Sequence, residues 1–468
     1  LIVCCDAGRR GGKLTAFPPR GEVAMRGAAH KPTQVLWFDR GLQPLQPRPG
    51  RDLLWDAERE RCWGRAVPCV ALESNAVSYT LYTSGTTGRP KGVQRDVGGY
   101  AVALAASMAL IFDGREGESY FSTSDIGWVV GHSYIVYGPL IAGMATVMYE
   151  GLPIHPDPGI WWRLVEKYKV TVMFSAPTAV RVLKKADPSY LQQADLSSLR
   201  ALFLAGEPLD EPTARWIRDA LAKPVIDNYW QTETGWPILT LARGVAEMHE
   251  RLGSPGVPMP GYRALIVDPE TGEDLVEPGQ KGVLAIDYPL PPGCLQTVWG
   301  DDARFVNTYW SSIPGRQLYS TFDLAMRDAD GYTFILGRSD DVINVAGHRL
   351  GTREIEECIA GLGSVAEVAV VGVADELKGQ VAVAFVVARQ AMADEVLTAQ
   401  VMQQVNEQLG AVARPARVVV VAALPKTRSG KLLRRAMQAL CEGREIGDLS
   451  TLEDAAALQA LAERLRPA

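Results

Sequence analysis

The chain has 468 residues, enough for more than one domain at about 100–200 residues each. Hydrophobic residues make up 47% and charged residues 22%, which is typical of a globular protein and excludes general disorder. The formal charge of −6 argues against nucleic acid or an anionic membrane as the main partner. The seven scattered cysteines include no Cys-x-x-Cys pair, so they favour reduced thiols in a cytoplasm over zinc ligands or a disulfide framework.

The first distinctive segment is the loop Tyr82–Gly92, which follows a predicted strand at 76–81. Its glycines and small hydroxyl residues let backbone N–H groups approach an anion closely, and Lys91 adds positive charge. The loop is not a Walker A motif, because Gly-x-x-x-x-Gly-Lys-Ser/Thr fails in every register. An anion-binding loop and a mobile Gly/Thr loop both remain open.

The longest apolar run, Ala101–Phe112, is too short to span a bilayer and predicts a buried helix. The N-terminus does not resemble a signal peptide, because the apolar run Leu1–Cys5 meets Asp6 directly. The chain begins with Leu rather than Met, which favours a fragment of a longer protein.

Short apolar runs alternate with longer amphipathic ones from Val170 to Trp230. We expect strands at 170–174, 201–205 and 225–229, with helices at 177–185 and 210–221. Strands that alternate with helices predict βαβ units and a parallel sheet, in which ligands bind beyond the carboxyl ends of the strands. This places the segments Ala205–Pro208 and Trp230–Gly235 at a candidate site.

The pattern then changes to short strands broken by glycine and proline, with a predicted hairpin of 318–327 and 332–336. Beyond residue 341 an α/β alternation resumes on a smaller scale. The predicted fold class is α/β, with a large multi-subdomain N-terminal domain that combines a parallel sheet and a β-rich subdomain. We expect this domain at 1–339 and a small mobile α+β C-terminal domain at 340–468.

Several motifs, in one order along nearly the whole chain, resemble those of the adenylate-forming (AMP-binding) enzymes, which include acyl-CoA synthetases, luciferases and peptide-synthetase adenylation domains. The matching segments are Thr83–Gly92 (AMP-binding signature), Tyr229–Gly235 (Tyr-x-x-Thr-Glu core), Ser320–Asp323 (Thr-Gly-Asp, with Phe322 where Gly is usual), Gly337–Asp341 (hinge), Gly347–Gly351 (the loop after it) and Pro425–Lys431 (C-terminal lysine motif). Asp125–Tyr134 and Gly206–Pro208 are similar to the acetyl/propionyl-CoA synthetase branch. Within this branch the chain as a whole most resembles the propionyl-CoA synthetases. Relatives of this branch carry a further N-terminal region, so we expect this chain to be N-terminally incomplete.

The resemblance implies roles for individual residues. Asp323 would accept hydrogen bonds from both ribose hydroxyls, although a turn aspartate that caps the hairpin is the simpler alternative. Glu233 would help to hold Mg²⁺ on the ATP phosphates. The implied nucleotide-binding set is Thr83, Ser84, Gly85, Thr86, Thr87, Gly88, Lys91, Gly206, Glu207, Pro208, Asp227, Asn228, Tyr229, Trp230, Gln231, Thr232, Asp323, Arg338 and Arg349.

Lys431 is the implied catalytic residue, which would bridge the substrate carboxylate and the α-phosphate as a flexible point charge. Its basic surroundings also fit a solvated helix end. Asp340 is the implied hinge about which the C-terminal domain turns between two half-reactions. His132 is interpreted as a packing or positioning residue and His348 as part of the hinge-side loop, because neither half-reaction of this family requires an obligatory general base.

The implied acyl pocket consists of Trp128, Val129, Ala205 and Trp230, and the implied coenzyme A contacts are Arg10, Lys13, Val130, Ala346 and Gly347. Trp230 would end the pocket, since longer-chain relatives tend to carry a small residue there. Ala205 would form its side, where acetate-using relatives tend to carry valine. A core aromatic is the alternative for Trp230, and a surface basic turn is the alternative for Arg10 and Lys13.

These features together predict activation of propionate by ATP and Mg²⁺ to propionyl-AMP and then, with coenzyme A, to propionyl-CoA. An acetyl-CoA synthetase or another short- or medium-chain acyl-CoA synthetase is the first alternative. A truncated nucleotide-binding protein without turnover is the alternative of another class. The expected partners are small-molecule substrates in the cytoplasm, with no nucleic acid and no membrane, and the sequence does not define the oligomeric state.

Overall fold

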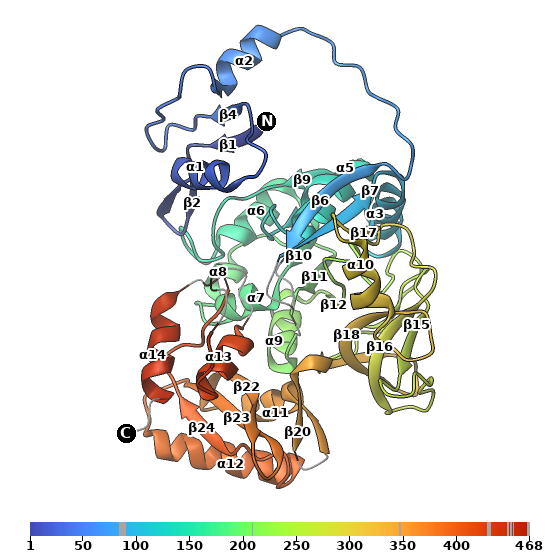
Figure 1. The fold of residues 1–468 in the computed structure, drawn as a ribbon, viewed down its shortest axis with the longest axis vertical. Helices are drawn as coiled ribbons and strands as arrows, with labels where there is room; N and C mark the ends of the chain where they lie inside the picture. Colours follow the sequence, from blue (N-terminus) through green and yellow to red (C-terminus); the bar gives the residue numbers. More distant parts are fainter. Residues whose placement is uncertain are drawn as a thin grey trace.

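The structure is a computed structural model that describes the chain apart from residues 84–89, 208, 346–347, 428–431, 447–448, 450–451, 453 and 466–468. Figure 1 shows a small N-terminal region, a central α/β body flanked by a β-rich region, and a C-terminal α+β region on the opposite side from the N-terminus.

The N-terminal region has its own parallel sheet in the order β1-β4-β5, next to a short hairpin and two helices. Met25, Val35 and Trp37 form its small core. Residues 63–76 then run without helix or strand to β6, as the long arc at the top of Figure 1. The elements are β1 Ile2–Cys5, β2 Ala7–Arg10, β3 Lys13–Ala16, α1 Pro18–Gly27, β4 Val35–Phe38, β5 Asp52–Leu54 and α2 Trp55–Cys62.

The central body is built on a five-stranded parallel sheet in the order β12-β11-β10-β8-β9. Successive residues of a strand point to opposite faces. Phe174 and Phe203 accordingly pack into one core, whereas Met173 and Leu202 pack into another on the other face. Burial on both faces explains why these strands are continuously apolar. The predicted strands and helices from 170 to 229 are confirmed, with small shifts at their ends.

The elements of this body are β6 Val77–Thr83, β7 Lys91–Asp96, α3 Gly98–Leu110, β8 Ser119–Ser122, α4 Val129–Gly131, the π-helix η1 His132–Tyr137, α5 Gly138–Ile141, β9 Ala145–Val147, α6 Ile160–Tyr168, β10 Val170–Ser175, α7 Pro177–Lys184, α8 Ser189–Gln192, β11 Ala201–Ala205, α9 Glu211–Leu221 and β12 Val225–Asn228. Helix α3 contains most of the predicted buried helix at 101–112 and packs into the first core.

The β-rich region contains an antiparallel sheet in the order β15-β16-β18-β19. Its last two strands confirm the predicted hairpin and place Asp323 opposite Arg338. The elements are β13 Leu239–Thr240, β14 Val257–Pro258, β15 Ala264–Val267, β16 Lys281–Asp287, β17 Thr297–Val298, α10 Asp302–Phe305, the π-helix η2 Val306–Trp310, β18 Leu318–Arg327 and β19 Thr333–Arg338. Strand β17 instead joins β7 and β6 in a three-stranded sheet.

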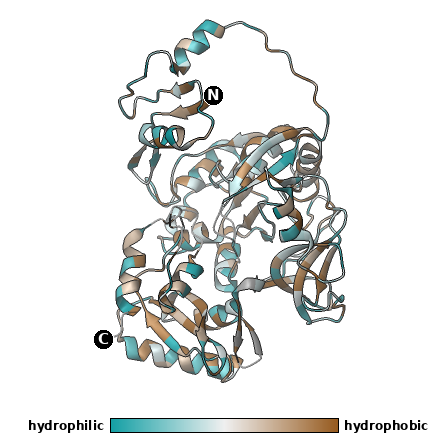
Figure 2. Ribbon diagram, viewed as in Figure 1, coloured by the Kyte–Doolittle hydropathy of each residue, from teal (hydrophilic) through white to brown (hydrophobic). Residues whose placement is uncertain are grey.

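The C-terminal region follows a 3₁₀ turn, η3 Ser339–Asp341, and contains a five-stranded sheet in which β21-β20-β23-β22 is extended by β24 on β23. Its strands are mainly apolar in Figure 2, and they carry separate cores on their two faces. The elements are β20 Val342–Val345, β21 His348–Gly351, α11 Thr352–Ala360, β22 Val365–Asp375, β23 Gly379–Ala388, α12 Asp394–Leu409, β24 Arg417–Val420, α13 Arg434–Cys441 and α14 Ala455–Leu465. Among the described residues, no helix has the length and apolarity needed to cross a membrane.

Candidate active site

The segments that follow two neighbouring strands of the parallel sheet begin at the same edge of that sheet. Ala205 ends β11, Asn228 ends β12, and the two residues are partners in the strand register. Gly206 turns the chain away from β11 with φ of +101°, a conformation that favours glycine. The predicted segments therefore leave the sheet side by side at its carboxyl edge.

The segment after β12 is attached to the β18–β19 hairpin through Asp323. Tyr229 donates a hydrogen bond from its hydroxyl to Asp323 Oδ2, and Gln231 Nε2 donates to the same oxygen at 2.9 Å. Gln231 also donates to the carbonyl oxygen of Thr321 at 2.6 Å. On the other side, Arg338 Nη1 lies 3.6 Å from Asp323 Oδ1. The structure thus brings together four predicted residues from segments about ninety positions apart.

Phe322, which stands where the resembled motif has glycine, has φ of +59°. The left-handed conformation costs a residue with a side chain roughly 1–2 kcal/mol. Its ring packs 5.7 Å from the Arg338 guanidinium and edge-on to Tyr309 at 6.2 Å. These contacts offset the backbone cost and place an aromatic ring beside the candidate ribose site.

Lys91 and Glu233 form an ion pair at the same edge, with Nζ and Oε1 2.5 Å apart and both side chains 11% exposed. Tyr309 completes the group, since its hydroxyl donates to Glu233 Oε1 at 2.8 Å and accepts from Lys91 Nζ at 2.5 Å. Burial raises the pKa of Glu233, but Lys91 and the hydrogen bond from Tyr309 outweigh it, so the net pKa is lowered. Glu233 is therefore an anion at neutral pH.

This anionic carboxylate fits the role predicted for it toward Mg²⁺. Magnesium commonly takes one or two protein carboxylates and completes its shell with water and phosphate oxygens. Within the described part of the chain, no cluster of three or more His, Cys, Asp or Glu side chains could hold a metal ion by itself. Glu233 thus fits Mg²⁺ that arrives with ATP rather than a metal held by protein groups alone.

The two acidic residues of the predicted adenine frame have different surroundings. Burial raises the pKa of Asp227 to about 7, which makes its charge sensitive to pH near neutrality. Glu207 instead accepts a hydrogen bond from Thr178 and pairs with Arg181 at 3.1 Å. Asn228 is buried and donates from Nδ2 to the carbonyl oxygen of Leu204 at 3.0 Å.

The predicted acyl-pocket residues are only partly assembled. Ala205 and Val129 are buried, and the Trp230 ring packs against Tyr134 at 5.5 Å and Phe174 at 6.5 Å. One side of the Trp230 ring therefore packs into the core. Trp128 is 43% exposed.

The predicted coenzyme A contacts lie on separate elements. Arg10 and Lys13 are register partners in the β2–β3 hairpin, and Lys13 is exposed. Val130 lies in α4 and is half-buried. Asp340 lies in the 3₁₀ turn η3, and the backbone of Arg349 is the register partner of Asn344 between β21 and β20.

Several predicted residues lie outside the described part of the chain, namely Ser84, Gly85, Thr86, Thr87, Gly88, Pro208, Ala346, Gly347 and Lys431. Thr83 and Lys91, on either side of the first loop, are register partners in β6 and β7. Two ion pairs of described residues flank residues 428–431. Lys426 forms an ion pair with Glu367 at 2.7 Å, and Arg434 pairs with Glu356 at 2.7 Å.

Three further residues contact the site and were not predicted from the sequence. Arg95 is fully buried and donates to the carbonyl oxygen of Thr232, and Tyr319 donates to Gln231 Oε1 at 3.1 Å. The third is Tyr309. Arg95 could have been found, because residues four apart on a strand share a face and β7 therefore directs Lys91 and Arg95 the same way. The two tyrosines follow no motif that would single them out.

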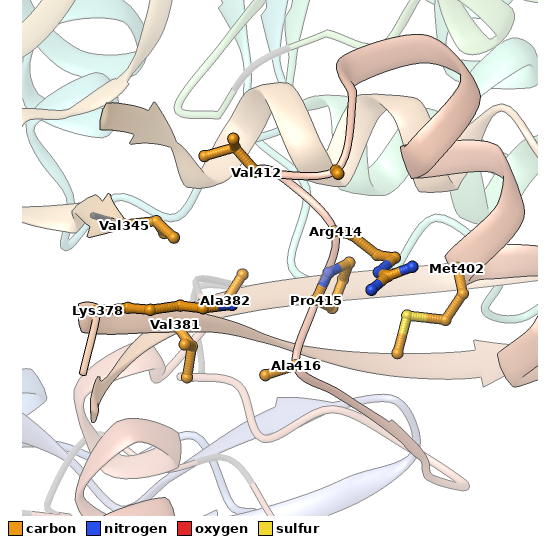
Figure 3. Close-up of a pocket in the computed structure, with 10 residues that line it drawn as sticks. Val345, Lys378, Val381, Ala382, Met402, Val412, Arg414, Pro415 and Ala416 are labelled. Atoms are coloured by element: carbon orange, nitrogen blue, oxygen red, sulfur yellow. The ribbon is translucent and has the colours of Figure 1, made fainter. Parts of the chain in front are cut away.

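A separate cavity of about 290 Å³ lies within the C-terminal region, between β20, β23 and the chain that follows α12. Figure 3 shows its mainly apolar lining, with Val345 on one side and Lys378 and Arg414 among the lining residues. This cavity contains none of the predicted site residues, and it does not coincide with the edge of the parallel sheet.

The fold, with its nucleotide-site motifs at the carboxyl edge and a small α+β region after η3, defines the class of adenylate-forming enzymes. Residues 25–290 match the AMP-binding enzyme family, and residues 354–431 match the AMP-binding enzyme C-terminal domain. The chain belongs to the AMP-binding enzyme family.

Individual proteins are similar to this chain in sequence, and a solved structure is similar to it in fold. The chain is 59% identical over 471 residues to the propionate–CoA ligase of Salmonella typhimurium, covering 99% of this chain and 75% of that protein. The propionate–CoA ligase of Escherichia coli is 58% identical with the same coverage. The acetoacetyl-CoA synthetase from Streptomyces lividans has a similar fold, with a TM-score of 0.86, 22% identity, and coverage of 99% of this chain and 70% of that one.

Proposed function

We propose that the chain is an AMP-forming acid–thiol ligase that converts propionate, ATP and coenzyme A to propionyl-CoA, AMP and pyrophosphate. The proposal rests on the position of the Asp323 carboxylate. Tyr229 and Gln231 hold it at the carboxyl edge of the parallel sheet, and Arg338 lies beside it. A carboxylate with two acceptor oxygens suits the two hydroxyls of a ribose. The 59% identity to a propionate–CoA ligase supports propionate as the acid.

In the first half-reaction, a carboxylate oxygen of propionate attacks the α-phosphorus of ATP, and the bond to pyrophosphate breaks. Lys91 and Arg338 supply positive charge beside the triphosphate, and Lys431 bridges the two anions that must meet. Mg²⁺, when bound with ATP, neutralises phosphate charge, and Glu233 is the residue that would hold it. No proton transfer is needed, because the attacking carboxylate is already ionised.

In the second half-reaction, the sulfur of coenzyme A attacks the acyl carbon, AMP leaves, and the thiol proton passes to solvent. We assign residues 340–468 as a domain that turns about Asp340 between the half-reactions. This rotation would move Lys431 out of the active site and bring in the loop that contains Ala346 and Gly347. Glycine at the second position leaves room for a narrow thiol-bearing chain. Arg10 and Lys13 are the assigned contacts for the phosphates of coenzyme A.

The test is to separate the half-reactions in the Lys431→Ala variant. Pyrophosphate release with propionate should fall at least a hundredfold, while thioester formation from supplied propionyl-AMP should stay within about threefold of wild type. Lys426→Ala is the matched control, since it removes a lysine of the same motif that already pairs with Glu367. Equal loss of both half-reactions in Lys431→Ala would contradict the assigned role.

A further inference from the structure

The Tyr309 hydroxyl contacts both charged side chains of the candidate phosphate site, Lys91 and Glu233. Its hydroxyl accepts from Lys91 Nζ at 2.5 Å and donates to Glu233 Oε1 at 2.8 Å. The Lys91 ammonium also lies 5.1 Å from the centre of the tyrosine ring. We propose that Tyr309 is a positioning residue for magnesium-bound ATP, an inference that rests on the proposed function.

The two opposite charges compete with the ligand for each other. Lys91 and Glu233 neutralise each other here, yet binding of magnesium-bound ATP requires Lys91 to face phosphate and Glu233 to face the metal. Once Lys91 turns toward phosphate, Glu233 keeps one hydrogen bond only if another donor remains in place. A buried carboxylate without a donor is strongly disfavoured. Tyr309 is the donor that lets the ion pair separate while Glu233 remains available to hold the metal.

The tyrosine ring is fixed well enough to serve as a stationary donor. It is 3% exposed and stacks on Tyr319, with the ring centres 5.1 Å apart and the planes at 5°. Phe322 closes a further side with an edge-on contact at 6.2 Å. Tyr309 also lies in the π-helix η2, a rare element that is frequent at functional sites.

The tyrosine hydroxyl can fill both roles at once, since its O–H donates to Glu233 while its oxygen accepts from Lys91.

The test compares ATP binding with and without Mg²⁺ in the wild type and the Tyr309→Phe variant, by calorimetry on the full chain. Phenylalanine removes only the hydroxyl and keeps the stack on Tyr319. The gain in ATP affinity caused by Mg²⁺ should fall about tenfold, the effect of one hydrogen bond to a charged group. Tyr262→Phe is the matched control, because this buried tyrosine donates to the carbonyl oxygen of Trp236 instead, and it should leave the gain unchanged.

Two further measurements separate positioning from a general structural effect. In steady state, Tyr309→Phe should raise KM for magnesium-bound ATP and leave KM for the acid unchanged. In the Glu233→Gln background, the same substitution should have no further effect on the Mg²⁺ gain. An unchanged gain in Tyr309→Phe, or an equal loss of ATP affinity with and without Mg²⁺, would overturn the proposal.

The ATP-binding measurements do not depend on catalytic turnover. A wild type that binds magnesium-bound ATP but activates no acid would refute the proposed function and still test Tyr309. If Tyr309→Phe lowers the stability, binding is measured below its unfolding temperature beside Tyr309→His, which keeps an aromatic ring and a hydrogen-bond donor and should retain more of the Mg²⁺ gain than Tyr309→Phe. Equal gains in those two variants would overturn the proposal.

Discussion

Ala205→Val should shift the preference of the enzyme from propionate toward acetate. Ala205 is buried at the end of β11, at the carboxyl edge to which the proposed function assigns the acyl group and the nucleotide. In the wild type, burial of the extra methylene of propionate contributes about 0.8 kcal/mol, and discrimination per methylene runs to about 1–3 kcal/mol. We therefore expect kcat/KM for propionate to exceed that for acetate by roughly 10–200-fold. Valine adds two methyl groups in that space and should remove this advantage, since overpacking costs about 1–3 kcal/mol.

The assay is pyrophosphate release with each acid at saturating ATP and Mg²⁺, expressed as the ratio of kcat/KM values. Ala201→Val provides the matched control, because Ala201 is also buried on β11 and shares its face, but lies at the opposite end of the strand. It should lower the free energy of unfolding without changing the ratio. An unchanged ratio in Ala205→Val, or an equal change in both variants, would refute the assignment of Ala205 to the pocket.

Three further predictions concern the hinge, pH and the lysine segment. Asp340→Pro fixes φ near −65° within the turn η3, so it should spare only one half-reaction, and unaltered overall turnover would contradict rotation about this residue. The raised pKa of Asp227, about 7, means that its contribution to stability is fully present below pH 4 and is lost as pH rises through 7. In denaturant titrations, Asp227→Asn should therefore reduce the fall in unfolding free energy between pH 4 and 8 by up to about 4 kcal/mol. If the unfolding free energy of the variant falls with pH as steeply as that of the wild type, Asp227 titrates normally. Arg434→Met removes the charged partner of Glu356, whose side chain is 12% exposed, and should cost about 3–5 kcal/mol of unfolding free energy. Arg464→Met, which breaks an exposed ion pair with Asp394, should cost less than about 1 kcal/mol, and similar costs would argue against the pair.

The parallel sheet could be predicted because its signal is local. Strands such as Val170–Ser175 and Ala201–Ala205 are continuously apolar, and the helices between them are amphipathic. The same rule placed the segments after Ala205 and Asn228 at one edge, since the carboxyl ends of parallel strands meet there. The hairpin that carries Asp323 and Arg338 followed from its turn residues in the same way.

The contacts that complete the site could not be predicted, because they join residues that are distant in sequence. Lys91 and Tyr309 are 218 positions apart, and the sequence around Tyr309 gives no periodicity that would reveal the π-helix η2. The positive φ of Phe322 was equally unexpected, since an aromatic residue disfavours that conformation unless packing compensates for it. Such features arise from tertiary packing rather than from local propensity.

The products of a single reaction show whether the chain makes an acyl-adenylate and then a thioester. Propionate, ATP, Mg²⁺ and coenzyme A should be incubated with the full chain, and the products quantified by chromatography and mass spectrometry. We expect propionyl-CoA, AMP and pyrophosphate in equal amounts, with more thioester from propionate than from acetate or butyrate. Release of ADP, or ATP binding without any thioester from these acids, would contradict it.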